Sequence, residues 1–220
     1  PEELISDAID PEIITVFEHF RDWMSSEGAE VSVVSLPVLD ACVAMYYIIA
    51  PAEASSNLSR FDGVKYGYRN SDGTSLLEMY ENTREEGFGA EVKRRILIGN
   101  YVLSSGYYDA YYKKAQQVRA LLSAKINEAL TSVDILLSPT SPTPAFRLGE
   151  KVNDPLAMYL ADIYTVSANI AGTPGISVPS GMIDGLPVGL QFLAGSGQDH
   201  KVFKAAAAYE KLVDWPQVAK

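Results

Sequence analysis

Three polar residues interrupt apolar segments and together could bind a small zwitterion. Tyr46 follows the run VLDACVAM, Arg95 opens ILIGNYVL, and Asp162 lies within MYLADIYTVSANIAG. A charged side chain is costly to bury unless it is paired. Arginine can hold a carboxylate through two hydrogen bonds, and aspartate can accept hydrogen bonds from an ammonium group. One interpretation is therefore a clamp for a free amino acid, and the other is a structural Arg–Asp pair or plain solvated faces.

The sequence motifs of several enzyme classes are missing. The chain has no G-x-S-x-G elbow, no P-loop, no G-x-G-x-x-G and no H-E-x-x-H. His19 and His200 lie far in sequence from any plausible nucleophile, which favours solvated or capping roles. Cys42, the one cysteine, lies in an apolar run and is expected to be a buried small hydrophobe. A disulfide within the chain and a cysteine-based zinc site are excluded, and we predict no catalytic residue or metal ligand from these residues alone.

Composition narrows the class of partner. The 220 residues are 47% apolar and 21% charged, which is typical of a folded globular protein. A net charge of −10 argues against a broad surface for nucleic acid or anionic membranes. No run of about 18 uninterrupted apolar residues is present, and the acidic N-terminus lacks the apolar segment of a secretory signal. We therefore expect no membrane partner and a cytoplasmic location.

Helices and strands alternate along the chain, which predicts an α/β protein. Asp10 and Pro11 are good N-terminal signals for a helix that ends near Gly28. Residues 31–36 indicate a strand, and Pro51 should break or restart the helix that follows. We further expect an irregular loop at 61–74, followed by a capping box at Ser75 and Glu78. Two helices should follow over 90–130, with a break at 104–106, and then a strand in VDILLSP. In the last part of the chain we expect a helix from Asp154–Pro155 through Ile163, a strand after Gly172 and a hairpin at Asp184–Gly185.

Four long segments resemble one family. They are similar to the amidase signature family. The four segments are APAEASSNLSRFDGVKYGYR, EGFGAEVKRRILIGNYVLSSGYYDAYYKKAQQVR, DILLSPTSPTPAF and DIYTVSANIAGTPGISVPSG…DGLPVGLQFLAG. The SSNLSRFDGVKYGYR and SSGYYDAYYKKAQ segments resemble in particular the A subunits of glutamyl-tRNA(Gln) amidotransferases. The resemblance implies the C-terminal part of the amidase signature fold, a mixed central β-sheet flanked by helices, over residues 1–220 as a single portion.

The resemblance also implies a glutaminase half-reaction. In the amidotransferases that these A subunits belong to, glutamine is hydrolysed, and the ammonia passes to a partner subunit that amidates Glu-tRNA(Gln) with ATP. The implied partners are glutamine, the B and C subunits, and the tRNA through the complex. No cofactor is implied for this chain, whereas ATP and Mg²⁺ are implied for the partner subunit.

The family's serine–serine–lysine triad has no counterpart in this sequence. The Ser-Ser pairs at 25–26, 55–56 and 104–105 lack the glycine-rich context of the signature. We therefore assign no catalytic residue and expect the chain alone to be inactive. Tyr46, Arg95 and Asp162 do match the family's glutamine-binding positions: Arg95 for the α-carboxylate, Asp162 for the α-ammonium and Tyr46 for a hydroxyl contact.

Other interpretations remain open. The chain could belong to a different amidase signature hydrolase, or be a non-catalytic scaffold domain that retains part of the fold. The 61–74 loop could contact a partner subunit or tRNA through Lys65, Tyr66, Tyr68 and Arg69, or be a solvated loop; its basic and aromatic side chains are too few for a nucleic-acid assignment.

Overall fold

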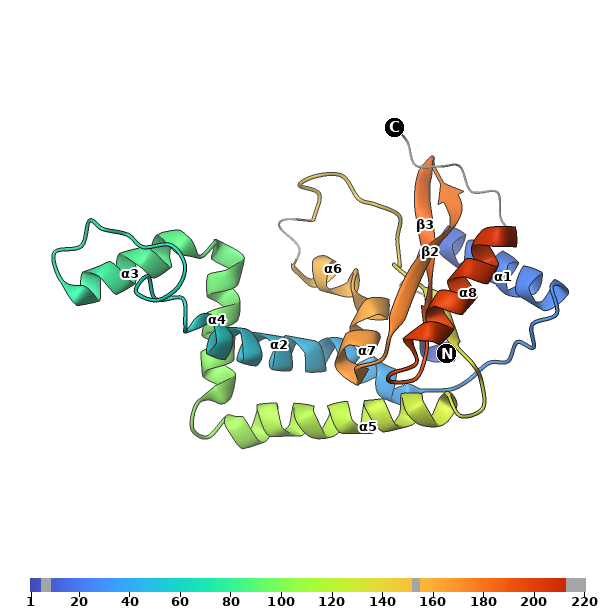
Figure 1. The fold of residues 1–220 in the computed structure, drawn as a ribbon, viewed down its shortest axis with the longest axis horizontal. Helices are drawn as coiled ribbons and strands as arrows, with labels where there is room; N and C mark the ends of the chain where they lie inside the picture. Colours follow the sequence, from blue (N-terminus) through green and yellow to red (C-terminus); the bar gives the residue numbers. More distant parts are fainter. Residues whose placement is uncertain (5–8, 152–154, 213–220) are drawn as a thin grey trace. The chain divides into compact units, whose positions relative to one another are not determined.

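The computed structural model describes residues 1–4, 9–151 and 155–212 (Figure 1). Its contacts divide the chain into two compact units, Pro1–Val43 with Arg119–Lys220, and Ala44–Val118. The boundaries between the units fall within α2 (Cys42–Leu58) and near the start of α5 (Lys114–Ala129). The prediction of a single domain portion stays a prediction.

The first unit contains the sheet. It consists of the strands β1 (Leu136–Pro139), β2 (Gly175–Ile183) and β3 (Leu186–Leu193) in the order β1-β3-β2, and both pairings are antiparallel. The α/β class is confirmed, and the described strands form a small antiparallel sheet. The other elements of this unit are η1 (Glu2–Leu4), α1 (Pro11–Ser26), η2 (Pro37–Ala41), α6 (Pro155–Leu160), α7 (Ile163–Ala171) and α8 (Asp199–Leu212).

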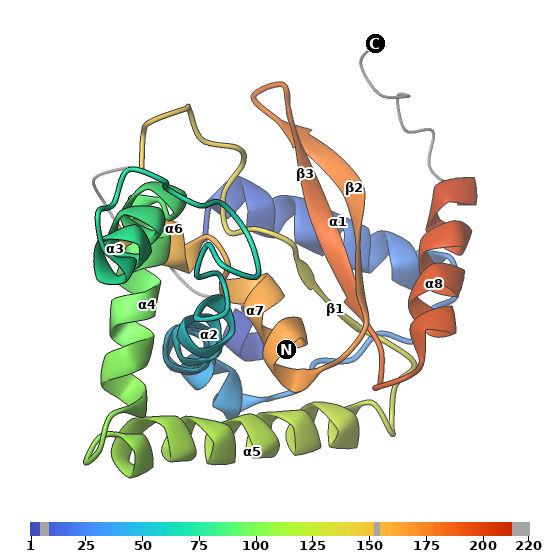
Figure 2. The same cartoon turned by 60° about the vertical axis from the view of Figure 1, so that its left-hand side comes forward.

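Helices α1 and α8 pack on one face of this sheet (Figure 2). Phe20 of α1 lies 6.1 Å from Phe192 of β3 and 5.0 Å from Tyr209 of α8, between ring centroids. Leu190 and Phe192 point to this face, because side chains two apart share a face of a strand. Burial of these large apolar side chains is the main stabilising contribution on this side of the sheet.

The start of α1 and the β2–β3 hairpin form as the sequence predicts. The Asp10 carboxylate accepts a hydrogen bond from the Glu12 amide at 2.9 Å, and Pro11 is the first helical residue. Asp184 and Gly185 have φ of 50° and 78°, the left-handed conformations that a type I′ hairpin turn requires. Local chemistry is therefore sufficient to set both features.

Three predicted elements are wrong in detail. Residues 31–36 form no strand, and Val33 is 75% exposed, since no strand in the described chain pairs with this segment. Pro51 lies inside α2 and does not break it. The helix predicted from Asp154 to Ile163 is two helices, α6 and α7, separated by a turn at 161–162; Asp154 itself lies outside the described residues.

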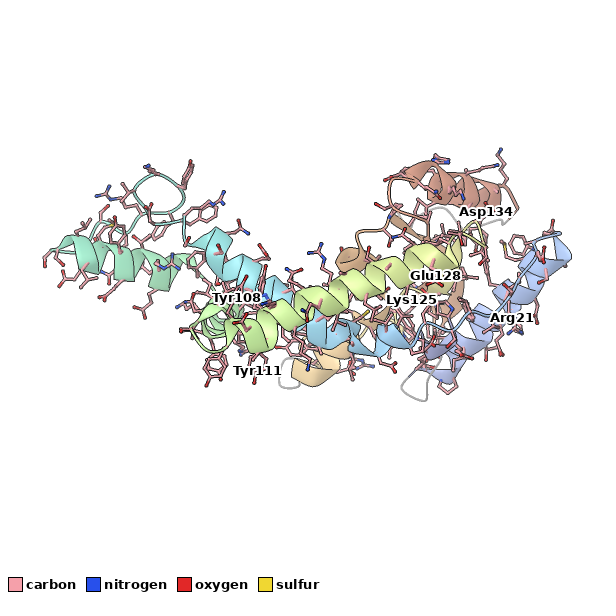
Figure 3. All side chains as sticks on the ribbon, turned by 90° about the horizontal axis from the view of Figure 1, so that it is seen from below. Arg21, Tyr108, Tyr111, Lys125, Glu128 and Asp134 are labelled. Atoms are coloured by element: carbon pink, nitrogen blue, oxygen red, sulfur yellow. The ribbon has the colours of Figure 1, made fainter. Side chains whose placement is uncertain are left out.

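In the second unit, a close helix crossing joins α2 to α4 (Ala90–Leu103). Gly99 of α4 lies against the Pro51 carbonyl and the Ser55 hydroxyl of α2, so closely that a Cβ at position 99 would lie 2.6 Å from Ser55 Oγ. Pro51 is buried at this crossing, which gives the proline a packing role inside its helix. After α4, the π-helical turn η3 (Tyr108–Lys113) leads into α5 and carries the exposed Tyr108 and Tyr111 (Figure 3).

The 61–74 loop is irregular, as predicted, and precedes α3 (Leu76–Gly87). Ser75 Oγ accepts from the Glu78 amide at 3.2 Å, as in a capping box. The Glu78 carboxylate, however, accepts from the amide and hydroxyl of Thr74. The capping interaction thus extends one residue further into the loop than the sequence pattern indicates.

The conformation of the 61–74 loop is expected to depend on acidity. Hydrogen bonds from the Val64 and Lys65 amides lower the pKa of Asp62, and those from Tyr68 and Asn70 lower the pKa of Glu86. A carboxylate with a lowered folded-state pKa stabilises the loop above its ordinary pKa, about 4, and loses that contribution as pH falls through the lowered value. NMR titration of the Val64 and Lys65 amides should give a midpoint below the ordinary aspartate pKa; a midpoint at or above it contradicts this prediction.

Cys42 is buried, as predicted, at the start of α2. Burial, together with the nearby Asp40 carboxylate, raises the pKa of its thiol to about 12, so the reactive thiolate is strongly disfavoured.

One described segment, Pro37–Leu58, is long and apolar enough to cross a membrane by length and composition, with a mean hydropathy of 1.3. Its buried Met45, Ile49 and Ala52 recur at helical spacing, the pattern of a core helix, which meets the same criteria. The absence of a membrane partner stays a prediction.

Candidate functional site

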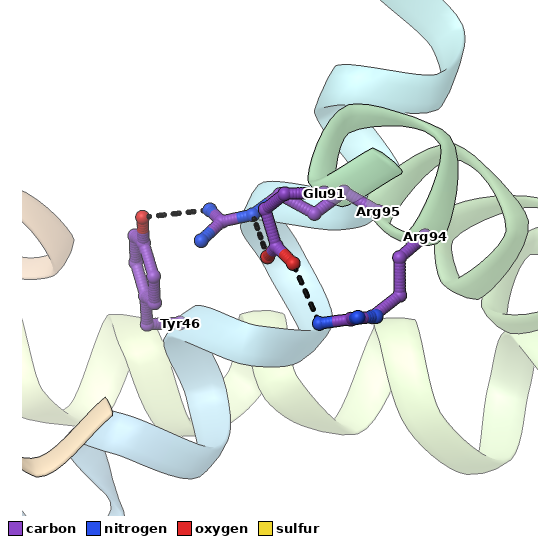
Figure 4. A network of polar contacts seen from close by, with 4 residues as sticks. All are labelled: Tyr46, Glu91, Arg94 and Arg95. Carbon is purple, nitrogen blue, oxygen red and sulfur yellow. Dashed lines mark hydrogen bonds and ion pairs between the residues drawn. The ribbon is translucent and has the colours of Figure 1, made fainter. Parts of the chain in front are cut away.

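Two of the three predicted ligand-binding residues lie together in the second unit. Tyr46 projects from α2 and Arg95 from α4, and Nη1 of Arg95 donates a hydrogen bond to the Tyr46 hydroxyl at 3.2 Å (Figure 4). Arg95 is one helical turn before Gly99, so the close α2–α4 crossing holds the two side chains within reach. The sequence places these residues 49 positions apart, and only the fold brings them into contact.

Glu91, which the sequence analysis missed, orients the guanidinium. Its Oε1 accepts from Arg95 Nε at 3.0 Å, and its Oε2 accepts from Arg94 Nη1 at 2.7 Å (Figure 4). The two arginines differ in exposure, with 31% of the Arg95 side chain exposed against 53% for Arg94. The i,i+4 spacing of Glu91 and Arg95 on a predicted helix is the sequence signal that could have identified this pair.

The environment keeps Arg95 protonated. Partial burial by itself would lower the pKa of Arg95, but the hydrogen bonds to Tyr46 and Glu91 outweigh it and raise the pKa. Nε and one donor of Nη1 are used by these contacts, and a guanidinium has five donors. Among the described residues Nη2 has no hydrogen-bond acceptor. An oriented, permanently charged arginine with donors to spare can bind a ligand carboxylate.

Asp162 lies in the first unit, at the N-cap position of α7, and not inside a helix as predicted. It is exposed, and its backbone carbonyl accepts from the Val166 amide at 3.0 Å as the helix begins. Its carboxylate makes no capping hydrogen bond. The argument from the cost of burial therefore does not apply to Asp162, which presents its carboxylate to solvent, where it can accept from an ammonium group.

Polar side chains of the same unit contact helix α7 near both of its ends. At its start, Gln191 of β3 donates to the Tyr164 carbonyl at 3.2 Å and contacts the Ser138 hydroxyl at 3.4 Å. At its end, Arg119 and Ser123 of α5 each donate, at 3.0 Å, to the carbonyls of Ile170 and Ala171. The contacts from Arg119 and Ser123 satisfy carbonyls at the end of α7 that the helix itself cannot, and the contact from Gln191 ties the first turn of α7, next to Asp162, to β3.

A cavity of about 280 Å³ lies beside the same turn, and Ala161, the neighbour of Asp162, lines it. Four hydroxyl-bearing residues contribute to its wall: Thr140, Ser141, Thr143 and Ser177. Thr140 Oγ1 and Ser177 Oγ are 2.7 Å apart. The sequence analysis predicted only a strand after Gly172 and gave the SPTSPTPAF segment no binding role, so it missed this cavity. Among the described residues, no group of three or more histidine, cysteine, aspartate or glutamate side chains could hold a metal ion.

Residues 1–203 match the amidase family, and the chain belongs to this family. It is 57% identical over 212 residues to the A subunit of the glutamyl-tRNA(Gln) amidotransferase of Syntrophus aciditrophicus, and the match covers 96% of this chain and 44% of that protein. It is 53% identical over 215 residues to the protein of the same name from Persephonella marina, and this match covers 98% of this chain and 44% of that protein. The predicted family is thus confirmed. The chain spans about 44% of the length of these curated relatives.

Solved structures agree with this assignment. The crystal structure of the A subunit of the glutamyl-tRNA(Gln) amidotransferase from Thermotoga maritima is 41% identical, with a TM-score of 0.74, and the match covers 99% of this chain and 42% of that one. A bacterial aryl acylamidase of the amidase signature family is 21% identical, with a TM-score of 0.67, over 94% of this chain and 41% of that chain. This second likeness shows the fold alone. Together they confirm the predicted amidase signature fold.

Proposed function

We propose that this chain is the glutamine-binding part of the A subunit of a tRNA-dependent amidotransferase. The observation that carries the proposal is the oriented guanidinium of Arg95, held by Tyr46 and Glu91 with donors left for a carboxylate. Support for the family comes from the high identity to A subunits over nearly the whole chain. An apolar amide substrate would have no use for a fixed carboxylate-binding arginine, which favours a free amino acid over the substrates of other amidases.

In this proposal each residue binds one group of glutamine. Arg95 binds the α-carboxylate, Tyr46 contributes its hydroxyl, and the exposed carboxylate of Asp162 accepts from the α-ammonium group. Binding both charged ends of the amino acid would fix its orientation and leave the side-chain amide in a defined place for hydrolysis.

The rest of the reaction is assigned to other parts of the assembly. We assign hydrolysis of the amide to a serine–serine–lysine triad outside these residues, so the chain alone should release no ammonia. B and C subunits would be the protein partners, and the subunit that amidates Glu-tRNA(Gln) would bind ATP and Mg²⁺. A cytoplasmic location follows from this role in translation.

Ammonia release by the full gene product that contains this chain, reconstituted with its B and C subunits, tests the proposed function. We expect release from glutamine to exceed release from an apolar amide, such as benzamide, at equal concentration. A preference for benzamide would contradict the proposal and favour a different amidase signature hydrolase.

Tyr46→Phe in the full gene product is expected to weaken glutamine binding by about 0.5–1.5 kcal/mol, which is the net contribution of one hydrogen bond. The substitution keeps the ring and removes only the acceptor for Arg95. Calorimetric titration with glutamine measures the effect. Tyr108→Phe, on the exposed turn of the same unit, is the matched control and should leave the dissociation constant unchanged. Equal affinities for the Tyr46→Phe variant and the unmodified protein would exclude a role for the hydroxyl.

A further inference from the structure

Tyr47, the neighbour of Tyr46 on α2, lies against the arginine that the proposed function uses. Cζ of Arg95 lies over the Tyr47 ring, 5.9 Å from the ring centroid. Nη1 of the same guanidinium donates to the Tyr46 hydroxyl at 3.2 Å. Adjacent residues of an α-helix point about 100° apart and do not face each other. Here, however, both tyrosines converge on one guanidinium of α4.

The two tyrosine rings also contact each other. Their centroids are 5.0 Å apart and their planes cross at 89°, so the edge of one ring meets the face of the other. This is one of the preferred arrangements of aromatic pairs, and both side chains are half-buried. The contact restricts the rotation of each ring, and it therefore helps to keep the Tyr46 hydroxyl directed at Arg95.

The Tyr47 ring gives Arg95 a contact that differs in kind from its hydrogen bonds. Glu91 accepts from Nε at 3.0 Å, and Tyr46 accepts from Nη1 at 3.2 Å (Figure 4). The face of an aromatic ring carries partial negative charge, which attracts a guanidinium within about 6 Å. Because this attraction acts on the charge of the whole group, the ring restrains Arg95 without depending on a particular N–H donor.

Restraint of Arg95 before a ligand arrives affects the affinity for that ligand. Arginine has one of the most flexible side chains, and ordering such a side chain costs free energy. When the free protein already holds the side chain in place, ligand binding does not incur that cost. Only a ligand that Arg95 binds can benefit. The ring should therefore strengthen the binding of a carboxylate and have no effect on a ligand that lacks one.

We propose that Tyr47 is a positioning residue that sets the specificity of the site for the α-carboxylate of glutamine. Its ring holds the Arg95 guanidinium and the Tyr46 hydroxyl in place, and it acts through them without touching glutamine. The inference rests on the proposed function, in which Arg95 binds that carboxylate. Two other roles compete with this one: the Tyr47 hydroxyl contacts glutamine directly, or the ring supports only the packing of the second unit.

Tyr47→Leu in the full gene product tests the role of the ring, because leucine keeps an apolar side chain and removes the aromatic face. Calorimetric titration should give a dissociation constant for glutamine that is raised about fivefold, the size expected for the loss of a partly exposed cation–π contact. 4-Aminobutanamide, which is glutamine without its α-carboxylate, should bind the variant and the unmodified protein equally. A general loss of structure would weaken both ligands, so the ratio of the two dissociation constants reports on positioning.

Further variants separate the ring from the hydroxyl and from the rest of the unit. Tyr47→Phe keeps the ring face and should bind glutamine with nearly the affinity of the unmodified protein. In an Arg95→Ala background, Tyr47→Leu should add no further loss, because the ring acts through the arginine. Tyr80→Leu, at a half-buried tyrosine of α3 in the same unit, is the matched control and should change neither constant. Tyr47→Met, which also removes the ring, takes the place of Tyr47→Leu if urea denaturation shows that the leucine variant is unfolded.

The other outcomes overturn the proposal in distinguishable ways. If Tyr47→Phe loses as much affinity as Tyr47→Leu, the hydroxyl and not the ring is responsible. If Tyr47→Leu weakens glutamine and 4-aminobutanamide equally, the ring has only a packing role. If Arg95→Ala weakens glutamine binding and Tyr47→Leu does not, the positioning role is wrong and the proposed function stands. If the unmodified protein binds glutamine no more tightly than 4-aminobutanamide, the proposed function itself is contradicted, and this inference with it.

Discussion

Replacing Arg95 with alanine in the full gene product is expected to weaken glutamine binding by about 2–5 kcal/mol, a loss of roughly thirtyfold or more. The substitution removes the donors that would hold the α-carboxylate and leaves the Tyr46 hydroxyl and Oε1 of Glu91 without their partner, while Oε2 of Glu91 keeps its hydrogen bond from Arg94. Part of the loss therefore reflects repulsion between the ligand carboxylate and the Glu91 carboxylate, whose charge Arg95 would no longer offset. Titration calorimetry with glutamine, in the unmodified protein and the variant, gives the two dissociation constants.

Arg94→Ala is the matched control for this experiment. Arg94 is adjacent in sequence and shares Glu91 with Arg95, but it is the more exposed of the two and does not contact Tyr46. An exposed ion pair of this kind contributes less than about 1 kcal/mol. If both variants weaken glutamine binding equally, the effect is one of general charge, and the assignment of Arg95 as the carboxylate-binding residue is wrong.

Gly99→Ala is expected to lower the free energy of unfolding by about 3 kcal/mol, the upper part of the range for an overpacked core. A methyl group at this position would overlap the Pro51 carbonyl and the Ser55 hydroxyl, so α2 and α4 must move apart. Because this crossing sets the distance between Tyr46 and Arg95, glutamine binding should fall as well. Urea denaturation followed by circular dichroism measures the stability.

The control for this substitution is Gly87→Ala, at the end of α3. A Cβ there would lie at an ordinary 3.7 Å from Tyr68 Cδ1, so we expect a change within about 0.5 kcal/mol. If Gly99→Ala is as stable as the unmodified protein and binds glutamine equally well, the close crossing does not position the site. Destabilisation without any loss of glutamine affinity would assign Gly99 to stability alone.

Features set by a few adjacent residues were predictable from the sequence. Asp10 and Pro11 start α1, and Asp184 with Gly185 turns the hairpin, because each depends on local backbone and capping chemistry. Residues 31–36 show why local pattern is insufficient. Their alternating apolar residues suit a strand, but a strand also needs a neighbouring strand for its backbone hydrogen bonds. Among the described residues the Glu2 amide donates to the Val34 carbonyl, and no strand pairs with the segment.

The candidate site was predictable in its residue types and not in its arrangement. Tyr46, Arg95 and Asp162 stood out because polar side chains interrupt apolar runs, and the family resemblance gave them roles. The contact between Tyr46 and Arg95 depends on the missing side chain of Gly99, which no local pattern signals as a helix crossing. The position of Asp162 at the start of α7 depends on tertiary hydrogen bonds, such as that from Gln191 to the Tyr164 carbonyl.

The central claim is that this chain recognises glutamine by both of its charged ends. Titration of the full gene product with glutamine and with two analogues tests the claim most directly: 4-carbamoylbutanoate, which lacks the α-ammonium group, and 4-aminobutanamide, which lacks the α-carboxylate. We predict that each analogue binds at least about thirtyfold more weakly than glutamine, as expected for the loss of one charge-assisted contact. Binding of either analogue with the affinity of glutamine would contradict the claim.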